Sequence, residues 1–152
     1  GYRRLCRRQM LMRHGRKVNK LNRTSSHRKA LMSNLISSLV VHKQIITTDA
    51  KAKELRRYAE RLVTYAKKDN LHGRRLILKN IKGSNSKSIA NILIHEIAPI
   101  YKDRNGGYTR IIKLANRKND NSLVSLIEFV DFKKSSSDDD EKVKDTSGDE
   151  KK

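Results

Sequence analysis

The chain has 152 residues, of which 36% are hydrophobic and 34% are charged, so its length suits one domain with a modest core. The formal net charge of +20 favours a polyanionic partner, either nucleic acid or an anionic membrane surface. No stretch approaches the roughly 18 to 20 apolar residues of a spanning helix, so the composition favours nucleic acid.

Residues 1–24 are predicted to form an extended basic arm. No Asp or Glu precedes Asp49, and apolar residues are too sparse before Arg23 to mark a helix or a strand. Arms of this composition usually order on their partner. Arg can bond two phosphate oxygens at once, and Asn and Ser can bond sugar hydroxyls or base edges. A merely solvated tail is the alternative, but a capped helix with a basic first turn follows directly.

The RNA contacts predicted in the arm and in the first turn of this helix are Arg13, His14, Arg16, Lys17, Lys20, Arg23, Ser25, Ser26, His27, Arg28 and Lys29.

Two helices and a short strand are predicted next. The first helix begins at Ser25 or Ser26, both good N-caps, and runs to about His42. Its apolar face is Leu31, Leu35, Ile36, Leu39 and Val40. Residues 45–48 are β-branched and predict a strand, after which Thr48 can cap the next helix. That helix is amphipathic, with an apolar stripe formed by Ala52, Leu55, Ala59, Leu62, Val63 and Ala66.

The rest of the domain is predicted to contain two helices and a hairpin. The helices cover about 71–81 and 87–98, and Pro99 breaks the second pattern near its end. Residues 103–107 form a turn signal, and 108–114 and 123–130 alternate as strands. The predicted fold is therefore α+β, with a small mixed sheet of about three strands packed against about four helices.

The end of the chain differs in composition from the domain at 25–132. Residues 133–152 carry six Lys against seven acids, so residues 1–132 carry a net charge of +21. The segment holds one Val and no aromatic residue, which predicts a disordered acidic tail.

Residues for catalysis or metal binding form no recognisable pattern. No metal-ligand pair of histidines, no nucleophile–base signature and no phosphate-binding loop occurs, and one cysteine, Cys6, allows neither an internal disulfide nor a zinc site of its own. The sequence therefore predicts no catalytic residue, no metal, no cofactor and no small-molecule substrate. Gly106 and Gly107 predict a turn with positive φ, and close approach of their backbone N–H groups to RNA phosphate is compatible with it.

Several long runs resemble the bacterial large-subunit ribosomal protein 17 family. The first run covers 12–17 and 21–31, the second 47–48 and 50–56, the third 103–111 with 113–114, and the last 126–130. They occur in the family's order over about residues 12–131. Residues 1–11 are extra to the family pattern, and Ala115 and Asn119 stand where the family typically has glycine.

The resemblance implies a structural, cytoplasmic component of the large (50S) ribosomal subunit that binds 23S ribosomal RNA near the exit of the peptide tunnel. It implies ribosomal proteins 22 and 32 of the same subunit as neighbours. Its implied fold is one helix, one strand, three helices and two strands. Further predicted RNA contacts across the domain are Lys51, Lys53, Arg56, Arg74, Arg75, Arg104, Asn105, Gly106, Gly107, Arg110, Lys113 and Arg117.

Two other functions compete with this one. A non-ribosomal DNA-binding module would share the charge, although no recognition helix is evident. A small ribonuclease would use His27 or His72.

Overall fold

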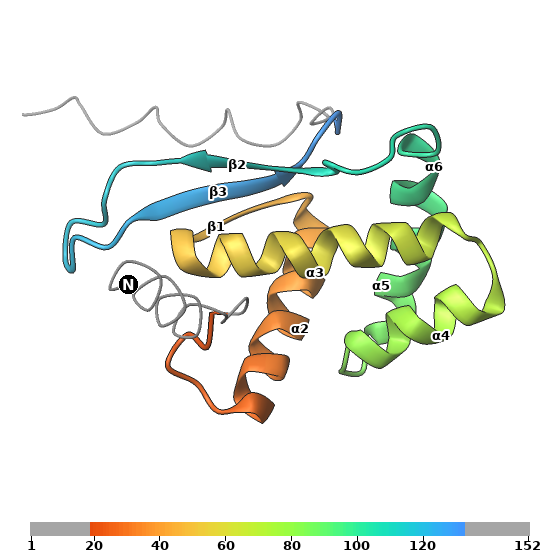
Figure 1. Cartoon of the computed structure of the whole chain (residues 1–152), viewed down its shortest axis with the longest axis horizontal. Coiled ribbons are helices and arrows are strands. Elements are labelled where there is room, and N and C mark those ends of the chain that lie inside the picture. Colours follow the sequence, from red (N-terminus) through yellow and green to blue (C-terminus); the bar gives the residue numbers. More distant parts are fainter. Residues whose placement is uncertain (1–18, 133–152) are drawn as a thin grey trace, which may run out of the picture.

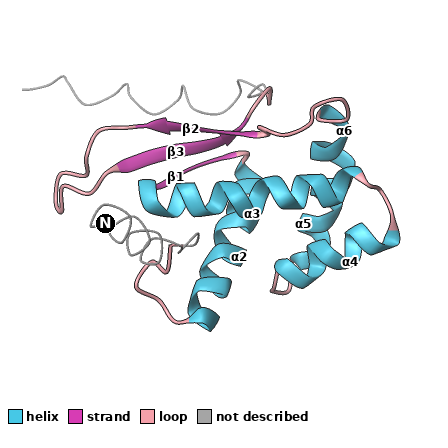
Figure 2. Cartoon of the chain, in the orientation of Figure 1, coloured by secondary structure: helices cyan, strands magenta, loops and turns pink. Residues whose placement is uncertain are grey.

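The computed structural model describes residues 19–132, which form helices on one side of a three-stranded sheet (Figures 1 and 2). The elements in chain order are α2 (Ser25–His42), β1 (Gln44–Thr48), α3 (Asp49–Lys67), α4 (Leu71–Asn80), α5 (Ser86–Ile92), η1 (Leu93–Ile97), α6 (Ala98–Ile100), β2 (Thr109–Lys113) and β3 (Val124–Phe129). The predicted α+β class is confirmed. Among residues 19–132, no helix is long and apolar enough to cross a membrane.

The sheet has the order β1-β3-β2, and both pairs of neighbouring strands are antiparallel. It is therefore not the mixed sheet that the sequence predicted. The hairpin places β3 beside β2. β1 is separated from the hairpin in the chain by the helices α3 to α6, and it pairs with the other edge of β3. Ile127 pairs with Ile45 on one side and Ile111 on the other, on the face toward the helices.

Helix α3 is the centre of the domain because it packs against the sheet and also against α2, α4, η1 and α6 (Figure 1). All members of its predicted apolar stripe are 3% exposed or less. Residues at three- and four-residue spacing lie on one side of a helix. This one stripe can therefore pack into the core that the helices and the sheet share. Gly73 lets α4 approach closely, because a Cβ there would lie 2.5 Å from the backbone oxygen of Tyr65.

The boundary and the buried face of α2 differ in detail from the prediction. The N-cap is Thr24, and Ser25 is already the first helical residue. Leu31 and Leu35 are only partly buried, whereas Met32 is 2% exposed. The buried face is therefore shifted by about one residue, because the sheet and α3 meet α2 on that side.

The predicted helix over 87–98 is divided into α5, η1 and α6. η1 is one turn of π-helix, in which the N–H of Ala98 donates to the carbonyl of Leu93. Pro99 has no N–H group, so it cannot donate to the carbonyl one turn earlier. The missing donor accounts for the widened turn directly before it.

Candidate nucleic-acid interface

The described end of the arm is a compact turn that directs the chain into α2. The N–H of Arg23 donates to the carbonyl of Lys20 at 3.1 Å, and Leu21 and Asn22 between them have positive φ. The guanidinium of Arg28 donates to the carbonyls of Arg23 at 3.2 Å and Lys20 at 3.5 Å. Arg28 therefore fixes the direction in which the arm leaves the domain, besides supplying charge.

Arg23, which lies just before α2, contacts His27 in the first turn of that helix. They are four residues apart, and an Arg23 Nη1 lies 2.5 Å from Nε2 of the imidazole. The ring uses acceptor capacity on this contact, and the remaining guanidinium N–H groups stay available. Ser25, Ser26 and Lys29 are exposed around the pair. This group can present several donors to one phosphate backbone.

A buried carboxylate holds the arm against α3. Glu54 is 4% exposed, and its Oε1 accepts the backbone N–H of Asn19 at 3.0 Å and lies 3.8 Å from Arg57 Nη1. Asp49 is the first residue of α3, where the positive end of the helix dipole favours its negative charge. Glu54 lies further along the same helix, and its carboxylate joins two segments 35 residues apart.

Two of the three cations predicted on α3 have no partner among the described side chains. Lys51 is half-buried and Arg56 is exposed. Lys53 instead lies 2.6 Å from Asp49, which also accepts a hydrogen bond from Ser125 at 3.2 Å. The hydrogen bond from Lys53 lowers the pKa of the Asp49 carboxyl below its ordinary value, and the Lys53 charge adds to this effect. Lys53 is thus partly neutralised before any RNA arrives.

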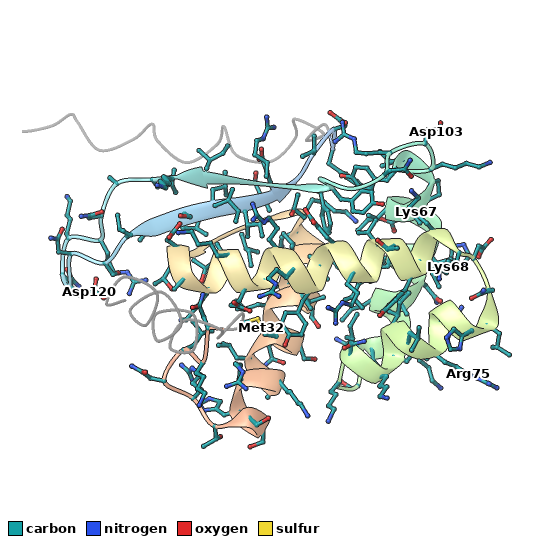
Figure 3. All side chains as sticks on the ribbon, in the orientation of Figure 1. Met32, Lys67, Lys68, Arg75, Asp103 and Asp120 are labelled. Atoms are coloured by element: carbon teal, nitrogen blue, oxygen red, sulfur yellow. The ribbon has the colours of Figure 1, made fainter. Side chains whose placement is uncertain are left out.

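The two arginines of α4 differ in environment. Arg74 donates to the amide oxygen of Asn91 at 2.7 Å and joins α4 to α5. Arg75 is exposed and points away from the domain (Figure 3). Arg75 is therefore the one of the pair with its whole guanidinium available to a ligand.

The turn before β2 is held in place by its own contacts. Gly106 and Gly107 have φ values of +122° and +64°, which confirms the predicted positive-φ turn. Arg104 pairs with Asp131 at 3.0 Å and donates to the carbonyl of Gly107 at 3.4 Å. Lys67 donates to the carbonyl of Arg104 at 2.7 Å from the end of α3. Asn105 is exposed on the same turn.

The basic residues of the hairpin are also partly paired. Arg110 lies 2.9 Å from Glu128, its cross-strand neighbour. Arg117 pairs with Asp120 at 3.5 Å, at the tip of the hairpin (Figure 3). Hydrogen bonds from the Ser122 hydroxyl and backbone lower the pKa of the Asp120 carboxyl. Lys113 is exposed.

The predicted contacts lie in separate groups. The segment before α2 and the hairpin tip lie toward one end of the long axis, whereas the 104–107 turn and α4 lie toward the other (Figure 1). Arg13, His14, Arg16 and Lys17 lie outside the described residues. An extended, irregular polyanion can reach such groups together. Within the described part of the chain, no cluster of three or more His, Cys, Asp or Glu could hold a metal ion.

A family model described as ribosomal protein L17 matches residues 31–130. This chain belongs to the ribosomal protein L17 family. The family predicted from the sequence is thereby confirmed, and with it the prediction of a structural ribosomal protein that is not an enzyme.

Relatives in this family match a larger part of this chain than the family model does. Large ribosomal subunit protein bL17 of Amoebophilus asiaticus is 50% identical over 121 residues, which cover 80% of this chain and 61% of the relative. The protein of the same name from Parabacteroides distasonis is 49% identical over 121 residues, covering 80% and 73%. That of Flavobacterium johnsoniae is 46% identical over 121 residues, covering 80% and 72%.

Proposed function

We propose that this protein is a structural constituent of the large (50S) subunit of the cytoplasmic bacterial ribosome, where it binds 23S ribosomal RNA near the exit of the peptide tunnel and supports translation. The observation that carries RNA binding is the acid-free, cationic stretch before Asp49, which enters α2 through the turn that Arg28 holds. The location near the tunnel exit is what the resemblance of the sequence to the family implies.

The mechanism is binding by charge neutralisation from a fixed origin. Lys and Arg that contact phosphates release condensed counterions, which supplies most of the sequence-independent affinity. Binding costs the domain little conformational entropy, because Glu54 and Arg28 already orient the start of the arm. Exposed cations such as Arg56, Arg75 and Lys113 extend the contact over the domain.

Sedimentation of the tagged full chain from bacterial lysate tests this function. On a sucrose gradient at low and at high salt, we expect the protein to migrate with the 50S peak at both. Migration at the top, or a 50S association lost in high salt, would mean that the charge drives only adventitious binding. A duplex-DNA shift assay with RNA competitor separates the DNA-binding alternative, because a ribosomal protein prefers structured RNA.

We also propose that the outer face of the sheet contacts a neighbouring ribosomal protein, with proteins 22 and 32 of the same subunit as the candidates that the family resemblance implies. Ile46, Leu126 and Ile112 are cross-strand neighbours and form an apolar row there. Ile46 is 65% exposed and Ile112 is 40% exposed. Apolar side chains make no favourable contact with RNA phosphates, whereas their burial against another protein removes apolar surface from water and is favourable.

Ile46→Lys tests the outer face against Leu71→Lys as the control. Both side chains are 65% exposed, so each substitution adds one charge at little cost in stability. We expect Ile46→Lys to reduce incorporation into 50S subunits several-fold, measured by competition with the unmodified chain, and Leu71→Lys to leave it unchanged. Equal incorporation of the two variants contradicts a protein contact on this face.

A further inference from the structure

A groove lies between the second half of α2, the segment that joins α4 to α5, and α5 itself. Its volume is about 530 Å³, and its lining includes Ser38, His42, Lys82, Asn85, Ser86 and Ser88. A volume in the range of about 300 to 1,000 Å³ is typical of pockets that hold small organic ligands. The groove is therefore large enough for one or two nucleotide units of a longer chain.

Contacts between α2 and Lys82 form this groove before any ligand binds. Ser33 is 2% exposed, and its hydroxyl accepts the backbone N–H of Lys82 at 2.7 Å and donates to the Lys82 carbonyl at 3.3 Å. These bonds use only the main chain of Lys82. Lys82 is an exposed residue of the lining, so its side chain is free to bind a ligand.

The polar groups of the groove are available to a ligand. The side chains of Ser38, His42, Lys82, Ser86 and Ser88 make no hydrogen bond or ion pair with any other described residue. No Asp or Glu lines the groove. A cation, an imidazole and several hydroxyls without acids are suited to bind phosphate oxygens and ribose hydroxyls.

Apolar side chains complete the lining. Val41, on α2, is 51% exposed, and Ile92, at the end of α5, is half-buried. These side chains can contact the face of a ribose or of an unstacked base, which is how single-stranded RNA is usually bound. RNA matches this lining more closely than an acidic peptide does, because every nucleotide unit carries a phosphate and a ribose hydroxyl, whereas a peptide has a negative charge only at its acidic side chains.

We infer that this groove binds a single-stranded segment of ribosomal RNA, with Lys82 and His42 at its phosphates and the serine hydroxyls at its sugars. This inference rests on the proposed function and adds a contact separate from the arm. Helix α2 has 18 residues and thus a length of about 27 Å. RNA would therefore contact both the start of α2, at Arg23 just before the helix and His27 in its first turn, and the last two turns of the helix.

Lys82→Gln in the full chain tests the inference, with Lys102→Gln as the matched control. Lys102 is exposed in the turn after α6 and does not line the groove. In filter binding to transcribed 23S ribosomal RNA, we expect Lys82→Gln to lower affinity about four- to six-fold at 0.15 M salt and the salt slope by about 0.7 to 0.9, the contribution of one phosphate contact. Lys102→Gln should change neither quantity, and equal effects of both variants would overturn the inference.

A second measurement locates the RNA directly. A hydroxyl-radical source tethered to Ser88→Cys, in a chain that also carries Cys6→Ser, should cleave 23S RNA in assembled 50S subunits at one short single-stranded segment. Absence of cleavage there would overturn the inference. So would unchanged affinity of Lys82→Gln for naked RNA together with poorer subunit incorporation, because that pattern indicates a protein in the groove.

The two proposals fail in different ways. If the unmodified chain does not bind 23S RNA, the proposed function itself is wrong. If it binds, and substitution of Arg23 weakens binding while Lys82→Gln does not, only the inference about the groove is wrong.

Discussion

Replacement of Arg23, His27 and Arg28 by alanine should weaken RNA binding strongly and leave the domain folded. The substitutions remove two guanidinium charges and the two hydrogen bonds with which Arg28 holds the arm. The buried face of α2 begins only at Met32, so no core side chain is lost. We expect the free energy of unfolding to fall by no more than about 1 to 2 kcal/mol, because His27 is exposed, Arg23 and Arg28 are only partly buried, and the lost hydrogen bonds tie down only the arm.

The size of the binding effect follows from the two charges. Each phosphate contact contributes about 0.7 to 0.9 to the slope of log K against log salt, so the slope should fall by about 1.4 to 1.8. Extrapolated from a 1 M reference, this corresponds to about 25- to 60-fold weaker binding at 0.1 M salt. Loss of the arm's fixed direction would add to this figure, because the arm would then have to be ordered on the RNA.

Filter binding to transcribed 23S RNA over a range of salt concentrations measures both quantities, and urea unfolding measures stability. The control is Lys79→Ala with Lys102→Ala, which removes the same charge from exposed side chains outside the predicted contacts. If this control lowers the slope as much as the arm variant, net charge alone decides affinity. If unfolding collapses together with binding, the arm is part of the fold and the reasoning fails.

Two further predictions concern the fold that carries the interface. The Tyr101 hydroxyl donates to the carbonyl of Val130, and burial raises the pKa of Tyr101 to about 12. The folded state therefore keeps a proton that the unfolded chain loses near pH 10. This stabilisation is complete below pH 10 and declines by about 2 to 3 kcal/mol toward pH 12. Tyr101→Phe should remove that decline in urea unfolding and lower the free energy of unfolding by about 1 to 2 kcal/mol at pH 7, whereas an unchanged decline of stability with pH would contradict the assignment to Tyr101. Gly73→Ala should lower the free energy of unfolding by about 1 to 3 kcal/mol, because the new Cβ would meet the Tyr65 backbone oxygen at 2.5 Å; a Tm equal to that of the unsubstituted protein would show that α4 can move away freely.

Local pattern predicted the secondary structure well where one periodicity dominated. The apolar stripe of α3 is buried in full, and the hairpin of β2 and β3 follows from two alternating segments around a polar loop. The prediction was weaker for α2, where apolar residues surround more of the helix and Met32 rather than Leu31 is buried. It also missed the π-helical turn, which depends on a donor that Pro99 lacks.

The sequence predicted which basic residues could bind RNA, but not which of them are already paired with an acidic side chain. Arg104 and Arg110 were chosen for their charge, yet Asp131 and Glu128 pair with them. The strand register places Glu128 opposite Arg110, 18 residues away, and no local spacing indicates that pairing. Similarly, no local pattern indicates the role of Glu54, because its partner, the backbone of Asn19, lies 35 residues earlier.

The sequence by itself determined the charge, the order of the elements and the family, because these depend on composition, on periodicity and on long runs of residues. Tertiary structure alone decided which cations are paired, how residues 19–24 lead into α2, and that α2, the 82–85 segment and α5 line a groove. Those properties depend on contacts between residues distant in sequence, whose geometry is established only when the helices and the sheet pack around α3.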